Sequence, residues 1–383
     1  MIWSRRGFLQ SLAVSALGGV AAQSSLKGMV SEASCEPTRS GQDGSLIRLD
    51  SNENAYGPST KVAAAIESYT GSVNRYSRSA YPALRERIAT FHKLNPHQVL
   101  LGCGSTDILR MAACAFLGPS KQLIQASPTF GALEHYARAV GSDVLSVPLT
   151  QAYAHDLDVM LLHASASASL IYICNPNNPT ASLTPRTDLE AFIGKLPAST
   201  IVLIDEAYHD YVGQSGMYRS FIDRCLIDDR VIVTRTFSKV YGLAGLRLGY
   251  AVASPRVVQR LHSYATENNV NSLVTHAAMA ALDDNAGVDQ FVRRNSDERQ
   301  EFFNQAMARA LKPIDSHTNF VMMNTYHPAN QVSEHFRQSG VLISRPFPAM
   351  DTYIRVSLGR QEEMIAFWRT WDILPFAKNI MHH

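Results

Sequence analysis

The sequence predicts an α/β protein, with a mostly parallel sheet in a larger domain and a smaller α+β domain after it. From about residue 97 to residue 252, short apolar runs alternate with helical segments, the pattern of a parallel sheet wrapped by helices. Polar and charged residues directly follow several of these runs, at the strand ends where such sheets place their sites. After about residue 275 the alternation is replaced by a long helical stretch and two strands, which predicts the second domain.

Seven short runs rich in Val, Ile and Leu are predicted to be strands of the larger sheet. They cover residues 99–101, 122–124, 144–147, 170–173, 201–204, 231–233 and 248–252. Helices are predicted from the glycine-rich turn 102–106 through Phe116, and over 133–140, 188–196 and 289–311. The two strands of the smaller domain are predicted at 319–323 and 353–357.

The composition limits the class of protein. The chain has 383 residues, 46% of them hydrophobic and 18% charged, enough for two or three globular domains. Its 35 Lys and Arg residues nearly balance 33 Asp and Glu residues, and no basic run forms a surface for nucleic acid. No apolar run reaches the roughly 18 residues that span a bilayer. Five cysteines without a CxxC pair are interpreted as structural thiols, so neither a metal site nor a disulfide framework is expected.

The first 45 residues are predicted to be separate from the folded domains. Arg5 and Arg6 precede an apolar stretch of small residues, the order found in twin-arginine export signals. Residues 1–22 are therefore predicted to be a signal peptide, cleaved or retained as an anchor, and residues 23–45 a linker. An amphipathic helix is the alternative, but the stretch has no charged face beyond its start. The expected location is the periplasm or the exterior, reached through the twin-arginine machinery.

A lysine among hydroxyls and glycines stands just past the predicted strand at 231–233. Burial at a strand end would lower the ammonium pKa of Lys239, and a neutral amine can attack a carbonyl to form a Schiff base. The hydroxyls of Thr236 and Ser238 and the guanidinium of Arg247 would suit a phosphate. Pyridoxal 5′-phosphate (PLP) carries both a carbonyl and a phosphate. A surface lysine in a polar loop is the alternative, and these neighbours argue against it.

Asp205 and Tyr208 strengthen the PLP interpretation. Asp205 ends the apolar run 201–204, and a buried carboxylate is destabilising unless it pairs with a cation. The protonated ring nitrogen of PLP would be that cation, and its proton keeps the ring an electron sink. Tyr208, three residues further on, could hydrogen-bond the ring hydroxyl. The alternative for Asp205 is the cap of a following helix.

Three further segments supply groups that a PLP site needs. Asn178 lies in the turn 175–180, where its amide could donate to the same ring oxygen, although Asn and Pro are also ordinary turn formers. The turn 102–106 opens a helix whose free amides favour a phosphate. Phe130 follows another strand and could stack on the ring, although a core position is more common for phenylalanine.

Together these segments resemble the fold type I PLP-dependent aminotransferases of class I and II. Within that group the chain is most similar to the histidinol-phosphate aminotransferase family, from about residue 46 to residue 370. The matching motifs are residues 49–59, 74–76, 175–180, 205–208 and 234–250, of which the last is the most specific. The resemblance implies a seven-stranded sheet in the larger domain. It also implies an N-terminal arm with part of the small domain at 46–75, a large PLP-binding domain at 76–274 and a C-terminal small domain at 275–383.

By this resemblance, Lys239 forms the Schiff base with PLP and later moves a proton between substrate and cofactor. Asp205 pairs with the pyridine nitrogen, and Asn178 and Tyr208 bind the ring oxygen. The residues expected around the phosphate are Gly104, Ser105, Thr106, Thr236, Ser238 and Arg247.

The resemblance also implies a homodimer and a set of substrate contacts. Tyr76 is expected to reach the phosphate of the neighbouring subunit's cofactor, so the active unit would be a symmetric dimer. Arg355 matches the arginine that holds the substrate carboxylate or its analogue, and Arg345 and Tyr56 match residues that contact the substrate phosphate. The alternative for both arginines is exposure on the surface. For Arg355 the alternation of its apolar strand argues against that alternative.

The expected reaction moves an amino group between an amino acid, or histidinol phosphate, and a 2-oxo acid. Ala55 and Ser77 stand where this family usually has proline, and Ala181 stands where it has glycine. Histidine biosynthesis is cytoplasmic, so the predicted export favours a paralogue that uses another amino donor. A PLP-dependent decarboxylase or lyase of the same fold is the first alternative, and a non-catalytic PLP-binding protein is the second. The intact Lys239 argues against the second, because a binder needs no Schiff-base lysine.

Overall fold

The computed structural model describes residues 46–76, 79–164, 168–213 and 215–375, within a compact unit that begins at Leu46. The predicted signal peptide with its paired arginines, the linker and Ser77 lie outside the described residues.

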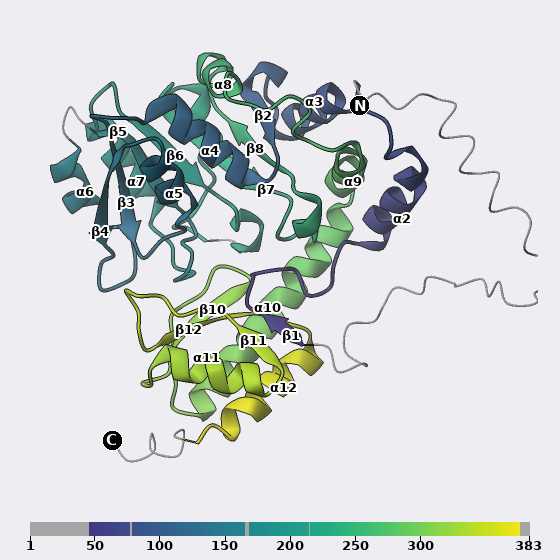
Figure 1. Ribbon diagram of the computed structural model, residues 1–383, viewed down its shortest axis with the longest axis vertical. Coiled ribbons are helices and arrows are strands. Elements are labelled where there is room, and N and C mark those ends of the chain that lie inside the picture. Colours follow the sequence, from purple (N-terminus) through teal and green to yellow (C-terminus); the bar gives the residue numbers. More distant parts are fainter. Residues whose placement is uncertain (1–45, 77–78, 165–167, 214, 376–383) are drawn as a thin grey trace, which may run out of the picture. The chain divides into compact units, whose positions relative to one another are not determined.

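A seven-stranded sheet forms the centre of the larger domain (Figure 1). The strands lie in the order β2-β8-β7-β6-β5-β3-β4, and neighbours are parallel except on both sides of β8. They are β2 (Val99–Gly102), β3 (Gln122–Ser127), β4 (Asp143–Pro148), β5 (Ala168–Cys174), β6 (Ile201–Asp205), β7 (Val231–Thr236) and β8 (Gly249–Val252). The predicted α/β class and its mostly parallel sheet are confirmed, with strand bounds that differ by a few residues.

Helices cover both faces of this sheet, because alternate residues of a strand point to opposite sides. Along β6, Val202 and Ile204 pack in one apolar core, and Leu203 packs in the other. The first core is completed by α2 (Thr60–Tyr69), α3 (Ala80–His92), α6 (Leu157–His163), α7 (Arg186–Lys195) and α9 (Ser272–Leu282). The second is completed by α4 (Ser105–Phe116), α5 (Ala132–Ala139) and α8 (Pro255–His262).

The smaller domain combines short strands with three helices (Figure 1). The central strand β10 (Phe320–Asn324) is antiparallel to both β9 (Lys312–Pro313) and β12 (Tyr353–Ser357). A separate parallel pair joins β1 (Ile47–Leu49) to β11 (Val341–Ile343), which brings the start of the described chain beside its last third. Helices α10 (Asn285–Ala308), α11 (Ala329–Gln338) and α12 (Gln361–Asp372) enclose a third core with these strands.

The residues at which the chain passes from one apolar core to the next differ from the predicted domain limits. The limit predicted at residue 275 falls inside α9, whose Val274 and Ala278 pack in the first core because this helix is apolar along most of its length. Helix α10 follows at once, and it carries Phe291 beside Tyr208 and then Phe302 into the third core. The N-terminal arm is likewise divided, since β1 joins the smaller domain while α2 packs on the larger one.

Short 3₁₀ turns connect the main elements: η1 (Thr70–Ser72), η2 (Pro96–Gln98), η3 (His209–Tyr211), η4 (Arg224–Leu226) and η5 (Ala244–Leu246). Within the described ranges, no helix is long and apolar enough to cross a membrane, and no group of His, Cys, Asp or Glu is arranged to hold a metal ion. The described cysteines, Cys103, Cys114, Cys174 and Cys225, are free thiols.

Candidate active site

A cavity of about 460 Å³ opens at the carboxyl ends of three neighbouring strands. Cys174 ends β5, Asp205 ends β6 and Thr236 ends β7, and all three residues line the cavity. The predicted site residues that line it are Ser105, Thr106, Phe130, Asn178, Asp205, Tyr208, Thr236, Ser238, Lys239, Arg247 and Arg355. Residues scattered over 250 positions of the sequence therefore meet at one edge of the sheet.

Lys239 reaches the cavity from the loop after β7. Its Nζ donates to the backbone oxygen of Asn52 at 3.0 Å and lies 5.6 Å from the centre of the Tyr208 ring. Burial, and next the nearby Arg355 guanidinium, lower the pKa of Lys239 to about 8. A fraction of the amine is therefore neutral near neutral pH and able to act as a nucleophile.

Asp205 is the most buried charged group of the cavity, with 2% of its surface exposed. The hydroxyl of Tyr172 donates to its Oδ2 at 3.0 Å, whereas its Oδ1 has no hydrogen-bond partner among the residues that the structure describes. Burial raises the pKa of this carboxyl. The unpartnered oxygen fits the predicted PLP, whose protonated ring nitrogen would supply the missing donor.

Hydroxyls, a guanidinium and a helix N-terminus form a subsite that is suited to binding a phosphate. Thr236 Oγ1 donates to Ser238 Oγ at 3.0 Å, and Arg247 Nη1 donates to the same Ser238 oxygen at 3.4 Å. The Arg247 guanidinium lies over Gly104, where φ is +75° and a Cβ would collide with it. Ser105 opens α4, so its backbone N–H is among those that a helix leaves without an internal partner. These donors are the groups that proteins use to bind phosphate.

A third set of contacts surrounds the Tyr208 hydroxyl. The amide of Asn52 donates to it at 3.0 Å and the amide of Asn178 at 3.5 Å. Arg355 then donates to Asn178 Oδ1 at 2.7 Å and to the backbone oxygen of Asp50 at 2.6 Å. Burial raises the pKa of Tyr208, so its hydroxyl keeps its proton and can donate to a ring oxygen.

Four predicted residues are not among those that line this cavity in the single chain. Arg345 is exposed, and Tyr76 is exposed over 85% of its surface. Tyr56 packs against Phe291 with a ring separation of 6.4 Å and lies under the guanidinium of Arg294. Gly104 stands at the cap of α4 beside Arg247.

Sequence reasoning did not single out two residues that matter here. Asn52 holds the centre of the site, because its N–H donates to Ser357 Oγ at 2.8 Å and its carbonyl accepts from Lys239 and from Asn319. Its place within the motif 49–59 was the only available indication. Tyr172 bonds Asp205 from the next strand, a contact that a single-strand pattern cannot predict.

Comparison with known proteins decides the family. The model of class I and II aminotransferases matches residues 45–367. This chain belongs to the class I and II aminotransferase family. Curated relatives of the aminotransferase include the histidinol-phosphate aminotransferase of Staphylococcus carnosus, 34% identical over 338 residues, which cover 87% of this chain and 92% of the relative. The enzyme of the same name from Moorella thermoacetica is 33% identical over 325 residues, 85% of this chain and 84% of the relative.

Solved structures share the fold of the aminotransferase. An Erwinia carotovora atroseptica protein provisionally named histidinol-phosphate aminotransferase aligns with a TM-score of 0.82 and 31% identity over 87% of this chain and 96% of its own. The histidinol-phosphate aminotransferase of Sinorhizobium meliloti, solved with pyridoxal 5′-phosphate, aligns with a TM-score of 0.81 at 24% identity, over 88% and 91%. The predicted family and fold type are confirmed.

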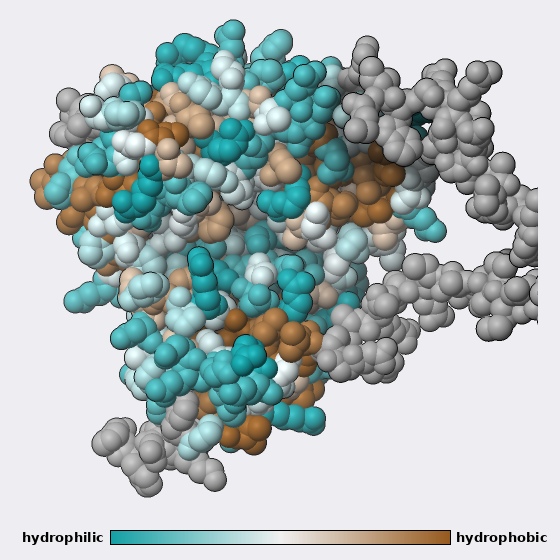
Figure 2. Space-filling view, viewed as in Figure 1, coloured by the Kyte–Doolittle hydropathy of each residue, from teal (hydrophilic) through white to brown (hydrophobic). Residues whose placement is uncertain are grey.

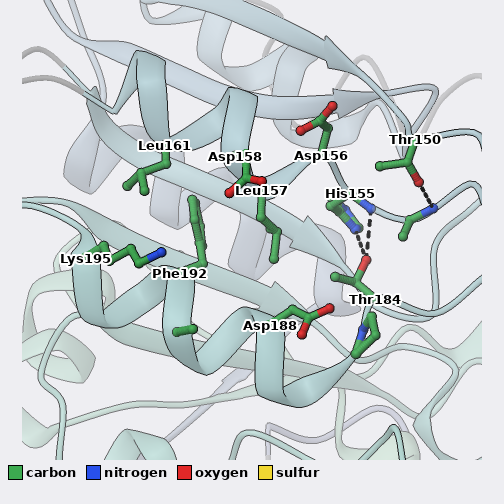
Figure 3. Close-up of a pocket in the computed structure, with 13 residues that line it drawn as sticks. Thr150, His155, Asp156, Leu157, Asp158, Leu161, Thr184, Asp188, Phe192 and Lys195 are labelled. Atoms are coloured by element: carbon green, nitrogen blue, oxygen red, sulfur yellow. Dashed lines mark hydrogen bonds between the residues drawn. The ribbon is translucent and has the colours of Figure 1, made fainter.

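The aminotransferase has a second cavity of about 360 Å³ between α6 and α7, lined by none of the predicted site residues (Figure 3). His155 on its wall is 4% exposed, and burial lowers the pKa of this imidazole to about 4, so the ring is neutral. Its Nδ1 lies 2.7 Å from Thr184 Oγ1. The N–H of Thr184 donates to Asn175 Oδ1, and the Asn175 amide donates back to the Thr184 carbonyl. This network braces the turn that carries Asn178.

Proposed function

We propose that this aminotransferase moves an amino group between an amino acid or related amine and a 2-oxo acid, at the cavity lined by Lys239 and Asp205. One observation carries the proposal: an amine with a lowered pKa and a buried carboxylate oxygen without a partner open on the same cavity. PLP accounts for both features, since its aldehyde reacts with an amine and its ring nitrogen can pair with a carboxylate.

The residues of the cavity would hold PLP at its ring and at its phosphate. When bound, PLP supplies an aldehyde that takes up the amino group and a ring that withdraws electrons from the substrate. Asp205 Oδ1 would hold the proton at the ring nitrogen. Tyr208 and Asn178 would donate to the ring oxygen, and Arg247 would hold the phosphate with the surrounding hydroxyls and amides. Phe130 would flank the ring.

Lys239 would act first as a nucleophile and then as a base. With a pKa of about 8, its Nζ can lose a proton near neutral pH and bond to a carbonyl carbon, whose oxygen would leave as water. Once released, the same neutral Nζ can take a proton from the substrate Cα and return it. The backbone oxygens of Ser51 and Asn52, at 3.4 and 3.0 Å, orient the amine for both tasks.

Arg355 is proposed to hold the acidic group of the substrate. It lines the cavity, and its planar guanidinium matches a carboxylate or a phosphate. Two curated relatives are named for histidinol phosphate, but the predicted export favours another amino donor. Arg345 and Tyr56 remain predicted substrate contacts. Since neither lines the cavity of a single chain, they would contact the substrate from outside that cavity.

A half-reaction tests the proposal. The purified enzyme is loaded with PLP, and its absorption spectrum is followed on addition of L-histidinol phosphate, glutamate and aromatic amino acids in separate cuvettes. Loss of the visible band and appearance of the pyridoxamine band identifies each amino donor. Conversion by histidinol phosphate alone would place the enzyme with its named relatives, and conversion only by another amine would support a paralogue.

The same experiment separates the alternatives. Release of carbon dioxide, ammonia or pyruvate without pyridoxamine formation would identify a decarboxylase or lyase. A visible band that no amine converts would support a non-catalytic PLP-binding protein. Either result would overturn the proposed amino-group transfer.

A homodimer that shares residues between its sites is also proposed. Tyr76 and Val73 expose 85% and 55% of their surface just after α2, and Figure 2 shows hydrophobic surface where Figure 1 labels α2 and α9. We expect two inactive variants, Tyr76→Ala and Lys239→Ala, to recover activity when their subunits are mixed and exchanged. Recovery requires that Tyr76 of one subunit complete the Lys239 site of the other. Mixed dimers without activity would contradict this arrangement.

Export through the twin-arginine route is proposed from the sequence of the first 22 residues. A reporter fused after residue 30 should reach the periplasm with the native leader and stay inside when Arg5 and Arg6 are both replaced by lysine. Equal export of the two fusions would refute the proposal.

A further inference from the structure

A tyrosine on the neighbouring strand contacts the carboxylate at the back of the cavity. Tyr172 of β5 is fully buried, and its hydroxyl donates to Asp205 Oδ2 at 3.0 Å. Strands β5 and β6 are parallel here, with Tyr172 beside Leu203 and Cys174 beside Asp205. The contact is therefore set by the register of two central strands of the sheet.

The hydroxyl makes the two oxygens of Asp205 unequal. Oδ2 is engaged by Tyr172, while Oδ1 is buried without a hydrogen-bond partner among the described residues. Because one oxygen is held, rotation of the carboxylate is restricted, and the other oxygen is left for a group inside the cavity. Without such a donor the carboxylate could rotate, and neither of its oxygens would be fixed in one direction.

The direction of this hydrogen bond favours the charged carboxylate. Burial and the nearby Asp205 raise the pKa of Tyr172 well above its usual value, so the phenol keeps its only proton and must donate it. Burial raises the pKa of Asp205, and the bond from Tyr172 opposes that rise. A donor to the charged form of a carboxyl stabilises that form.

The other groups around Asp205 differ from Tyr172 in charge or in the contact that they make. The Cys174 thiol on β5 is neutral because burial raises its pKa, and Glu206 is an anion paired with Arg235. From the remaining elements, Tyr208 and Lys239 interact with Asp205 through charge, without a direct hydrogen bond to it in the described structure. The backbone N–H of Ala207 also favours the charged carboxyl. The Thr234 side chain also favours the charged carboxyl. Tyr172 is the neutral side-chain donor with a hydrogen bond of 3.0 Å to Oδ2, and its removal changes no net charge.

We propose that Tyr172 is a positioning residue of the aminotransferase, which orients Asp205 so that its Oδ1 holds the proton on the cofactor's ring nitrogen. This inference rests on the proposed role of Asp205 in binding PLP. Tyr172 acts through Asp205 and has no contact with the substrate in this role.

The consequence of Tyr172→Phe follows from the loss of one donor. The ring and its packing are kept, but Asp205 loses the bond that stabilises its charge, so the pKa of its carboxyl rises. A more basic carboxylate draws the shared proton toward its own oxygen, so the ring nitrogen carries that proton for a smaller fraction of the time than in the wild-type enzyme. We expect the ratio of protonated to neutral ring nitrogen at neutral pH to fall by up to about tenfold, the effect of roughly one pKa unit.

The experiment uses PLP labelled with ¹⁵N in the ring and bound to the full-length enzyme. The ¹⁵N chemical shift reports protonation of the nitrogen directly, and the dissociation constant of PLP is measured beside it. Tyr172→Phe should move the ¹⁵N shift at pH 7 toward that of neutral pyridine and weaken PLP several-fold. Incorporation of 3-fluorotyrosine at Tyr172, a stronger donor of the same shape, should move the shift in the opposite direction.

A matched control is Tyr250→Phe. Tyr250 is also a buried tyrosine of the same sheet, and its hydroxyl lies 2.8 Å from His92 Nε2, away from Asp205. Its loss removes one buried hydrogen bond without touching the cofactor pair, so the ¹⁵N shift should equal that of the wild type. If Tyr172→Phe fails to fold, the fluorotyrosine protein decides the question.

Two outcomes overturn different statements. If Asp205→Asn changes the ¹⁵N shift and PLP affinity while both Tyr172 proteins match the wild type, Tyr172 has no positioning role and the proposed cofactor site stands. If Asp205→Asn leaves both quantities unchanged, Asp205 does not hold the ring nitrogen, and the proposed cofactor site fails together with the inference.

Discussion

The two sides of the active cavity are built in different ways. On the cofactor side, Cys174, Asp205 and Thr236 end three adjacent strands of one sheet, so strand register alone brings them together. On the substrate side, Arg355 belongs to β12 of the smaller domain. Its partners Asn178 and Asp50 are 177 and 305 residues away in the sequence.

This difference separates the chemistry of the site from its specificity. A group held by one sheet is positioned when that sheet forms, whereas Arg355 is positioned only when the arm and both domains have packed together. Changes on the cofactor side should therefore abolish the reaction. Changes on the substrate side should alter the affinity for substrate and leave the cofactor bound.

Removal of the lysine amine should have the largest effect. Lys239→Ala is expected to lower turnover by at least ~10³-fold, because both the nucleophile and the proton-transfer group are lost, and to abolish the visible absorbance of bound PLP. Steady-state kinetics and the absorption spectrum check this. Lys195→Ala, a change on the rim of the second cavity, is the control. Wild-type turnover by Lys239→Ala would remove the basis of the site assignment.

A conservative change on the substrate side should have an intermediate effect. Arg355→Lys removes the planar fork that bonds Asn178 and Asp50, so KM for the amino donor should rise ~10- to 100-fold, as for the loss of a charge-assisted hydrogen bond. The spectrum of bound PLP should not change. Arg337→Lys, on the surface of α11 beside Glu334, is the control. A lost visible band with unchanged KM would show that Arg355 serves the cofactor instead.

A methyl group at Gly249 should disturb the phosphate subsite alone. A Cβ there would collide with the backbone nitrogen of Ser105 and approach the Gly104 carbonyl carbon to 2.7 Å, so the start of α4 must shift. Gly249→Ala is expected to weaken PLP about 10-fold, as overpacking by one methyl often costs ~1–3 kcal/mol. Pyridoxal, which lacks the phosphate, should bind unchanged. Gly194→Ala, where a Cβ meets nothing within 4 Å, is the control, and equal loss for both ligands would contradict the prediction.

The smallest predicted effect concerns stability. Ala181, where the family usually has glycine, has φ of +63° and is fully buried. The left-handed conformation costs an L-residue ~1–2 kcal/mol, and glycine loses ~0.5–1 kcal/mol through its greater freedom when unfolded. Ala181→Gly should therefore raise the free energy of unfolding by about 0.5–1 kcal/mol in denaturant titrations. Ala64→Gly, in the exposed face of α2, should lower it by about 1 kcal/mol, and a loss at both positions would contradict the prediction.

Most of the cofactor side could be predicted because its signals are local. Asp205 directly follows an apolar strand, and Lys239 lies three residues after β7 in a motif of hydroxyls and glycines. The carboxyl ends of parallel strands lie at one edge of a sheet, so these residues were expected to lie close together. Tyr172 was not predicted because its partner lies on another strand. Asn52 was not predicted because its four hydrogen-bond partners come from four distant segments.

Periodicity, strand-end chemistry and family motifs in the chain established the α/β class, the family and the identity of the reactive lysine, because each depends on residues close together in the sequence. Which oxygen of Asp205 accepts from Tyr172, how Arg355 enters the cavity, and why Gly249 has no side chain depend on contacts between segments that only packing brings into register. Hydrophobic burial is non-directional, so it drives these segments together without specifying their partners; close packing and paired hydrogen bonds make that choice.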